Sequence, residues 1–162
     1  MYKINDLLLY KGDVCKVSDI TTIHDNKYYV LTPINDESLT IKVPVTSEDK
    51  LLKNIMSRED ANKLISEIGD VEIINGNEHS IENEYQHLLS TGDKKDLIKI
   101  IKTTYLRNKN RLDNGKKIGE RDSNYFELAE KILYTEIAVS LGLSFDDAKE
   151  YIINKMKEDK YA

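Results

Sequence analysis

The chain has 162 residues, of which 40% are hydrophobic and 33% charged, and its formal net charge is −5. This composition is typical of a globular protein with one ordinary domain or two small ones, and it excludes a disordered chain. The acidic balance excludes a global attraction to nucleic acid, so such binding would need a local basic patch. No apolar run approaches the ~20 residues that span a bilayer, and the first residues do not resemble a signal peptide. We therefore expect a cytoplasmic protein without a membrane partner.

The first 45 residues predict short β-strands. Residues 7–10, 14–20, 27–33 and 39–45 are rich in apolar, β-branched or aromatic side chains, and turn-forming residues separate them. The last run alternates, with one face made of Leu39, Ile41, Val43 and Val45 and the other of Thr40 and Lys42. Four or five short strands in this length favour a small barrel or a strongly bent sheet.

After Pro44 the apolar spacing becomes helical. A helix is expected to begin at Ser57 and to end at Gly69, and further helices at about residues 80–91, 94–109, 123–141 and 145–157. The expected caps are Asp93, Ser123 and Ser144 at helix starts and Gly142 at a helix end. The sequence thus predicts an α+β protein with a β-rich domain at 1–46, a bridging helix and linker at 47–79, and an all-helical domain at 80–162.

The residue types that usually carry catalysis or bind metals are sparse. The three histidines (His24, His79 and His87) have no metal-like spacing, and the one cysteine, Cys15, lies in a strand-like segment where a small buried side chain is expected. The seven glycines form no phosphate-binding loop. We therefore expect no catalytic residues, no metal site and no cofactor, and a protein that is not an enzyme.

Charge is distributed in two opposite blocks. Residues 67–93 hold seven acids and neither lysine nor arginine. Residues 94–121 hold three acids and ten bases, which are Lys94, Lys95, Lys99, Lys102, Arg107, Lys109, Arg111, Lys116, Lys117 and Arg121. This basic window is either a solvated helix face with a lysine-rich loop or a contact surface for DNA phosphates or an acidic partner. A third outcome is that the acidic block pairs with it. Within the window, Tyr105 has the helical spacing of a core residue rather than of a platform for stacking bases.

Several short motifs follow one another along the chain. In the β-rich part they are residues 5–10 (Asn-Asp-Leu-Leu-Leu-Tyr), 13–20 (Asp-Val-Cys-Lys-Val-Ser-Asp-Ile), 28–31 (Tyr-Tyr-Val-Leu) and 39–45 (Leu-Thr-Ile-Lys-Val-Pro-Val). In the helical part they are residues 90–93 (Ser-Thr-Gly-Asp), 100–107 (Ile-Ile-Lys-Thr-Thr-Tyr-Leu-Arg), and the spaced patterns at 111–117 and 129–142. Their order resembles the CarD/CdnL/TRCF family of bacterial transcription regulators, in particular its clostridial-type members, over about residues 4–152.

The resemblance implies a Tudor-like or SH3-like N-terminal barrel that binds the RNA polymerase β subunit. It also implies a C-terminal helical domain that can touch promoter DNA, with neither catalysis nor a cofactor. Lys42 aligns with the basic residue of the family strand that faces the polymerase, and Thr40 and Leu39 lie beside it. The other interpretation of Lys42 is a solvated lysine that discourages aggregation at a sheet edge.

Two departures from the family pattern concern its turns and its DNA contact. The His-Gly-x-Gly turn is replaced by residues 12–15 (Gly-Asp-Val-Cys). The tryptophan wedge of members that hold the promoter open is absent, because the chain has no tryptophan and the aligned residues 77–82 are acidic. We therefore expect any DNA binding to be weak, non-specific and confined to the basic window. The alternative function is an interaction module of the same fold with another partner and no DNA binding.

Overall fold

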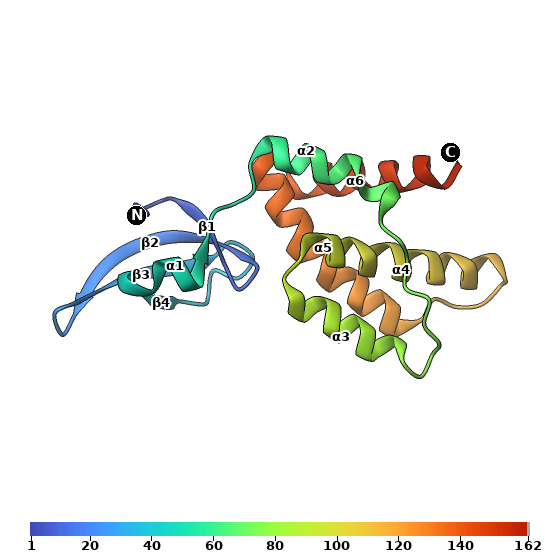
Figure 1. The fold of residues 1–162 in the computed structure, drawn as a ribbon, viewed down its shortest axis with the longest axis horizontal. Coiled ribbons are helices and arrows are strands. Elements are labelled where there is room, and N and C mark those ends of the chain that lie inside the picture. Colours follow the sequence, from blue (N-terminus) through green and yellow to red (C-terminus); the bar gives the residue numbers. More distant parts are fainter. Residues whose placement is uncertain (162) are drawn as a thin grey trace. The chain divides into compact units, whose positions relative to one another are not determined.

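The computed structural model describes residues 1–161, except the side chains of residues 156 and 159–161. The chain divides into two compact units, residues 1–56 and 57–162. Within the described residues every strand belongs to the first unit, and the long helices follow in the second (Figure 1). The predicted α+β class, with a β-rich part before a helical part, is confirmed.

The first unit is built on one antiparallel sheet with the strand order β4-β3-β2-β1-β5. The strands are β1 (Leu7–Tyr10), β2 (Asp13–Ile23), β3 (Asn26–Pro33), β4 (Ile41–Pro44) and β5 (Leu52–Lys53). Two-residue turns join the first three strands, and all four turn residues, Lys11, Gly12, His24 and Asp25, have positive φ. Such turns match the twist of a hairpin. A register shift between Val17 and Asp19 interrupts the long β2–β3 ladder.

The sheet is open, which corrects the barrel expected from the sequence. Among the described residues, β4 pairs only with β3 and β5 only with β1. Closure would require these two outer strands to pair with each other, but no such pairing is present in the described part of the chain and β5 is only 2 residues long. Strands β1 to β4 fall in the four runs expected from the sequence, whereas β5 was not expected and the closed barrel is not observed.

Strand alternation places the core of the first unit on one face of this sheet. Seven side chains there are no more than 5% exposed, namely Leu8, Cys15, Val17, Tyr29, Leu31, Val43 and Leu52. Burial, with a smaller contribution from Asp13, raises the pKa of the Cys15 thiol to about 11. Cys15 is therefore the small buried side chain expected from its neighbours, and its thiolate is rare at neutral pH.

The first unit extends beyond residue 46, where the sequence-based division ended it. The short helices η1 (Val45–Ser47) and α1 (Glu48–Leu51) and strand β5 belong to it. The hydroxyl of Tyr29 donates a hydrogen bond to Glu48, and Tyr29 accepts one from the backbone nitrogen of Tyr2 at 3.1 Å. Because these contacts and the β1–β5 pairing attach residues 47–53 to the sheet, the boundary lies after Met56.

The described residues of the second unit form six helical segments. They are α2 (Arg58–Ser66), η2 (Ile68–Asp70), α3 (Ile81–Thr91), α4 (Lys94–Asp113), α5 (Glu120–Leu141) and α6 (Phe145–Tyr161), with residues 71–80 crossing between η2 and α3. The crossing segment is called the strap below. Its Ile74 nitrogen donates to Thr103 Oγ1 at 2.9 Å, and Lys102 Nζ donates to the Val71 carbonyl oxygen at 2.7 Å. The strap is thus bonded to α4 rather than free.

Most of the predicted caps are present. The side chains of Ser57, Asp93 and Ser144 each accept a hydrogen bond from a backbone nitrogen in the first turn that follows. Gly142 has φ of 68°, and the Leu143 nitrogen closes a Schellman-type turn on the Ala138 carbonyl at 2.9 Å.

Several helix ends differ from the prediction. Helix α4 continues to Asp113 rather than ending at about residue 109, and α6 continues to Tyr161 rather than ending at about residue 157. The helix expected to end at Gly69 ends at Ser66, and a separate 3-10 turn includes Gly69. Helix α5 begins at Glu120, so Ser123 lies one turn inside it and is not its cap. Asn108 of α4 explains the earlier start, because it accepts a hydrogen bond from Gly119 N and donates one to Ser123 Oγ.

Candidate functional site: an exposed edge strand and a charged face of helix α4

Strand β4 presents the residues proposed from the sequence to bind a partner. Lys42 is exposed and lies opposite Val30 of β3, while Val43 is 1% exposed and Ile41 packs partly against the core. Because neighbouring residues of a strand point to opposite faces, Lys42 projects away from that core. It has no ion-pair partner among the described side chains. Because β4 is an outer strand, one of its two backbone edges has no neighbouring strand, and Lys42 places a positive charge beside that edge.

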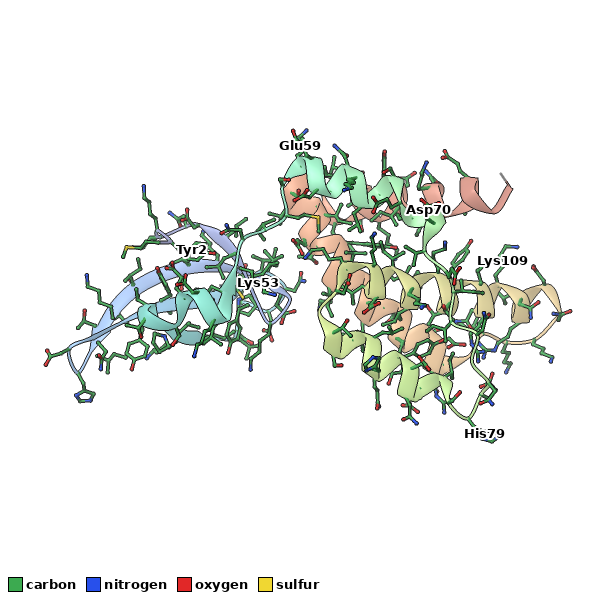
Figure 2. All side chains as sticks on the ribbon, viewed as in Figure 1. Tyr2, Lys53, Glu59, Asp70, His79 and Lys109 are labelled. Carbon is green, nitrogen blue, oxygen red and sulfur yellow. The ribbon has the colours of Figure 1, made fainter. Side chains whose placement is uncertain are left out.

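Leu39 and Thr40 precede β4 and are not part of the sheet. Both are exposed, and Leu39 is 51% exposed, although the alternation had placed it on the buried face with Ile41 and Val43. The backbone explains the difference, because the Leu39 nitrogen bonds to the Asp36 carbonyl oxygen at 3.2 Å in a turn. Leu39, Thr40 and Lys42 are therefore all exposed, with the partly buried Ile41 between Thr40 and Lys42 (Figure 2 draws the side chains of this unit).

The basic window lies on α4, on the loop after it and on the first turn of α5, and most of its charges are engaged within the second unit. Lys94 pairs with Glu136 at 3.3 Å, and Lys95 pairs with Glu67 at 3.1 Å. Lys109 pairs with Asp113 at 3.3 Å. The amine of Lys102 donates to the backbone oxygens of Ile68 and Val71, at 2.8 and 2.7 Å. These four bases are therefore not open phosphate contacts.

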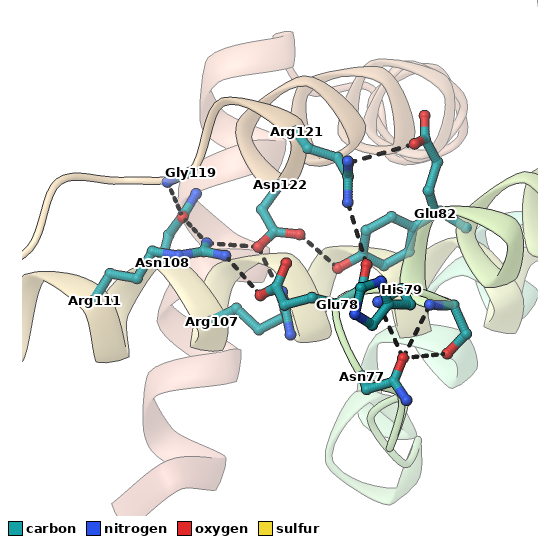
Figure 3. Close-up of polar contacts among 12 residues, drawn as sticks. Asn77, Glu78, His79, Glu82, Arg107, Asn108, Arg111, Gly119, Arg121 and Asp122 are labelled. Carbon is teal, nitrogen blue, oxygen red and sulfur yellow. Dashed lines mark hydrogen bonds and ion pairs between the residues drawn. The ribbon is translucent and has the colours of Figure 1, made fainter.

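The two arginines of the same helix meet a buried carboxylate (Figure 3). Asp122 Oδ2 accepts hydrogen bonds from Arg107 Nε at 2.9 Å and from Arg111 Nη1 at 2.6 Å. Asp122 Oδ1 accepts a third from the Tyr85 hydroxyl at 2.7 Å. Since Asp122 is 1% exposed and Tyr85 0%, this cluster fixes α3, α4 and α5 to one another.

A second carboxylate reaches the arginines from the strap (Figure 3). Glu78 Oε1 lies 2.5 Å from Arg107 Nη2 and 3.5 Å from Arg111 Nη2. Nearby, Arg121 Nε lies 3.5 Å from Glu82 Oε2. Acids of the 67–93 block therefore pair with bases of the 94–121 window, which is the intramolecular pairing that the sequence left open.

The pKa shifts follow these contacts. Burial raises the pKa of Asp122, but the hydrogen bonds from Tyr85, Arg111 and Arg107 outweigh it and hold that pKa below its ordinary value. Burial lowers the pKa of Arg107, and its bonds to Asp122 and Glu78 reverse the shift. For Tyr85, burial and the adjacent carboxylate both raise the pKa. Asp122 and Arg107 are therefore held in their charged forms and Tyr85 in its neutral form at neutral pH.

Three bases of the window, Lys99, Lys116 and Lys117, have no ion-pair partner among the described side chains. Lys99 lies on α4 beside a hollow that Glu67, Asp70 and Lys95 also line. Lys116 and Lys117 are exposed in the loop between α4 and α5. The open positive charge of the window is thus concentrated in that loop.

Tyr105 lies on another side of α4, where its ring is half-buried and 6.5 Å from the ring of Phe126. Both rings line a hollow of about 340 Å³ that also includes Glu130 and Lys149. Glu130 is 6% exposed, and its Oε1 lies 3.1 Å from Lys149 Nζ. Burial raises the pKa of Glu130, against the opposite effect of Lys149. Tyr105 therefore packs between helices, in keeping with its helical spacing.

Asp122, Glu78 and Tyr85 are the structurally prominent residues that sequence reasoning missed. Arg107 and Arg111 are four residues apart and so share a helix face, which was a usable signal for a common partner. The opposite charges of the two blocks were a second signal. Neither pattern identifies which acid is buried, because Asp122 reaches the arginines from a different helix.

Among the described residues, no group of three or more His, Cys, Asp or Glu side chains is arranged to hold a metal ion. Within the same part of the chain, no helix is both long enough and apolar enough to cross a membrane. The chain matches no known family model and no curated protein.

Proposed function

We propose that this chain is a non-enzymatic transcription regulator that binds the β subunit of bacterial RNA polymerase through its first unit. The single observation that carries the proposal is the outer strand β4, in which Lys42 is exposed and projects away from the core. This strand lies within the segment 39–45 that resembles the polymerase-facing strand of the CarD/CdnL family. In this proposal the open sheet is a variant of the Tudor-like module, and the helical unit makes at most weak contact with promoter DNA.

The proposed contact is strand-to-strand docking. An edge strand offers a row of backbone donors and acceptors, so a strand of the partner adds to it through main-chain hydrogen bonds, while outward side chains select the partner. Here Lys42 supplies a positive charge, and Leu39 supplies an exposed apolar side chain on the approach to the strand. We expect the partner surface to combine an exposed strand with a carboxylate placed to meet Lys42.

The test is a titration of the full chain against the isolated lobe of the β subunit. We expect Lys42→Glu to weaken binding by more than about 1.4 kcal/mol, a factor of ten, without loss of folding. Lys53→Glu is the matched control, because Lys53 is an exposed lysine on β5, the opposite outer strand. A folded Lys42→Glu protein with unchanged affinity would refute the assignment of β4. If the wild-type chain does not bind the lobe, the polymerase proposal itself is wrong.

A second candidate function is an interaction module with a partner other than polymerase and without DNA binding. Two observations favour it: the chain has no tryptophan to act as a wedge, and the bases of α4 are largely paired with the protein's own acids. Recovery of proteins from a bacterial lysate separates the two functions. Capture of the β subunit by wild type and its loss with Lys42→Glu support the first, and capture of a different protein through the same strand supports the second.

A further inference from the structure

The two arginines of α4 are oriented by one carboxylate and face another. Asp122 holds Arg107 through Nε and Arg111 through Nη1, and these bonds leave the Nη2 groups of both arginines directed at Glu78 (Figure 3). A pair of guanidinium groups that converge on one carboxylate has the geometry that also suits the oxygens of a phosphate, because both anions accept two or more N–H bonds. The Glu78 carboxylate stands where such an anion would lie.

The two carboxylates differ in how firmly they are held. The Asp122 side chain is 2% exposed, whereas the Glu78 side chain is 66% exposed. A buried carboxylate with three hydrogen bonds is a fixed part of the structure, but an exposed ion pair contributes little and is screened by salt. Glu78 can therefore leave the arginines without disturbing Asp122, and its departure leaves two arginines facing one remaining acid, a net positive site.

The strap allows this movement of one side chain. On one side of Glu78 the strap is bonded to α4 through Ile74. On the other side Asn77 Oδ1 accepts hydrogen bonds from the backbone nitrogens of His79 and Ser80, at 3.0 and 3.1 Å. Because both flanks are tied by backbone contacts, Glu78 can rotate toward solvent while the strap stays in place.

Two of the lysines without an ion-pair partner among the described side chains, Lys116 and Lys117, follow Arg111 closely along the chain. The backbone nitrogen of Lys116 donates to the Arg111 carbonyl oxygen at 2.8 Å, so the loop with Lys116 and Lys117 begins at the arginine pair. A backbone of repeated phosphates would meet the arginines and then this loop. A single free phosphate would gain nothing from the loop, so this arrangement favours a nucleic-acid strand as the source of the phosphate.

We infer that Arg107 and Arg111 form a phosphate-binding cradle that Glu78 occupies as an internal competitor, so that a backbone phosphate of nucleic acid binds by displacing Glu78. The inference rests on the DNA-contacting part of the proposed function and is independent of the contact between β4 and polymerase. It explains why the wild-type protein should bind nucleic acid only weakly although ten bases lie in one window. It also gives one acid of the 67–93 block a specific role, which is to compete with phosphate for Arg107 and Arg111.

The test is a fluorescence-anisotropy titration of a labelled DNA duplex of about 20 base pairs, at several salt concentrations, with the full chain. We expect Glu78→Gln to bind at least about fivefold tighter than wild type, and the slope of log affinity against log salt to become steeper by about 0.9, the value of one added phosphate contact. Glu72→Gln is the matched control, because Glu72 lies on the same strap, is exposed and pairs with neither arginine among the described side chains. It removes the same charge and should change affinity by less than about twofold.

A second variant tests whether the gain in affinity needs the arginine fork, and a second probe tests whether a free phosphate compound binds as well as DNA. In Glu78→Gln/Arg107→Lys the charge of the cradle stays but its fork geometry is lost, so the gain should disappear while the protein remains folded by circular dichroism. Pyrophosphate should compete with the duplex only at concentrations far above that of the DNA phosphates. Equal effects of Glu78→Gln and Glu72→Gln, no gain with Glu78→Gln, or pyrophosphate binding as tight as duplex binding would each overturn the inference. None of these outcomes bears on binding of the β subunit, which the Lys42 experiment decides separately.

Discussion

Lys42 on β4 and Arg107 on α4 carry the same charge in opposite surroundings. Lys42 is exposed and has no ion-pair partner among the described side chains, whereas Arg107 contacts both Asp122 and Glu78. Lys42 can meet a partner directly, whereas Arg107 is held by the buried Asp122 and, in the cradle inferred above, meets a phosphate only where Glu78 is displaced. The comparison shows that the availability of a charge depends on which acids the fold brings to it, so one lysine in the β unit can matter more for binding than a dense basic window.

The largest expected effect tests whether the arginines of α4 are structural. Asp122→Ala removes the buried acceptor of three hydrogen bonds and leaves two guanidinium groups and the Tyr85 hydroxyl without it. We expect the free energy of unfolding to fall by about 3–5 kcal/mol, the usual cost of breaking a buried ion pair. Urea denaturation followed by circular dichroism measures the change.

Asp113→Ala is the control for that experiment. Asp113 also pairs with a base of α4, Lys109, but its side chain is 64% exposed, so its removal should cost no more than about 0.5 kcal/mol. Similar losses in the two variants would contradict the distinction between buried and exposed pairs.

The next effect is a dependence of stability on acid pH. The pKa of Asp122 is lower in the folded protein than its ordinary value of 3.8. A carboxyl group with a lowered folded pKa contributes its full stabilisation above the unfolded value, and that contribution is lost as the pH falls below 3.8 through the folded value. The wild type should therefore lose stability over that range, and Asp122→Asn should lack this part of the loss. Thermal unfolding between pH 2 and pH 6 measures it, and parallel acid curves for the two proteins would show that Asp122 is not the responsible group.

A smaller effect concerns the lysines of the α4–α5 loop. Lys116→Glu/Lys117→Glu should flatten the salt dependence of duplex binding, because two phosphate contacts account for a slope of about 1.8. The same variant should leave the free energy of unfolding within about 0.5 kcal/mol of wild type, since both side chains are exposed. A large loss of stability would show that the loop is structural, and an unchanged slope would show that DNA does not contact it.

The smallest effect concerns Glu130, which is also buried in α5. Glu130 has a raised pKa because burial outweighs the opposite effect of Lys149. A carboxyl group with a raised folded pKa destabilises the folded protein above that pKa, and the cost disappears as the pH falls through it. Glu130→Gln should therefore change the stability at neutral pH by less than about 1 kcal/mol, with no acid-dependent loss. A destabilisation as large as that of Asp122→Ala would show that the Lys149 pair stabilises the fold as strongly as the arginine cluster does.

The sequence by itself determined the features that depend on near neighbours. The caps at Ser57, Asp93 and Ser144 and the left-handed end at Gly142 involve groups within about one helical turn, so residue type and spacing were sufficient. The same holds for Ile41 and Val43 facing the core while Lys42 faces away, because alternation is a local property of a strand. The antiparallel strands joined by tight turns follow from the same short-range patterns.

The tertiary structure alone decided the features that join distant residues. Glu78 and Arg107 are 29 positions apart, and Tyr29 and Glu48 are 19 apart. Glu78 adds a negative charge beside Arg107 and Arg111. The bond between Tyr29 and Glu48 attaches α1 to the sheet, so the first unit includes α1 and ends at residue 56 rather than at residue 46. The start of α5 at Glu120 depends likewise on Asn108 of another helix. Local propensity carries no information about which of many acids a folded chain places beside a given base, because that choice is made by the packing of whole helices and strands.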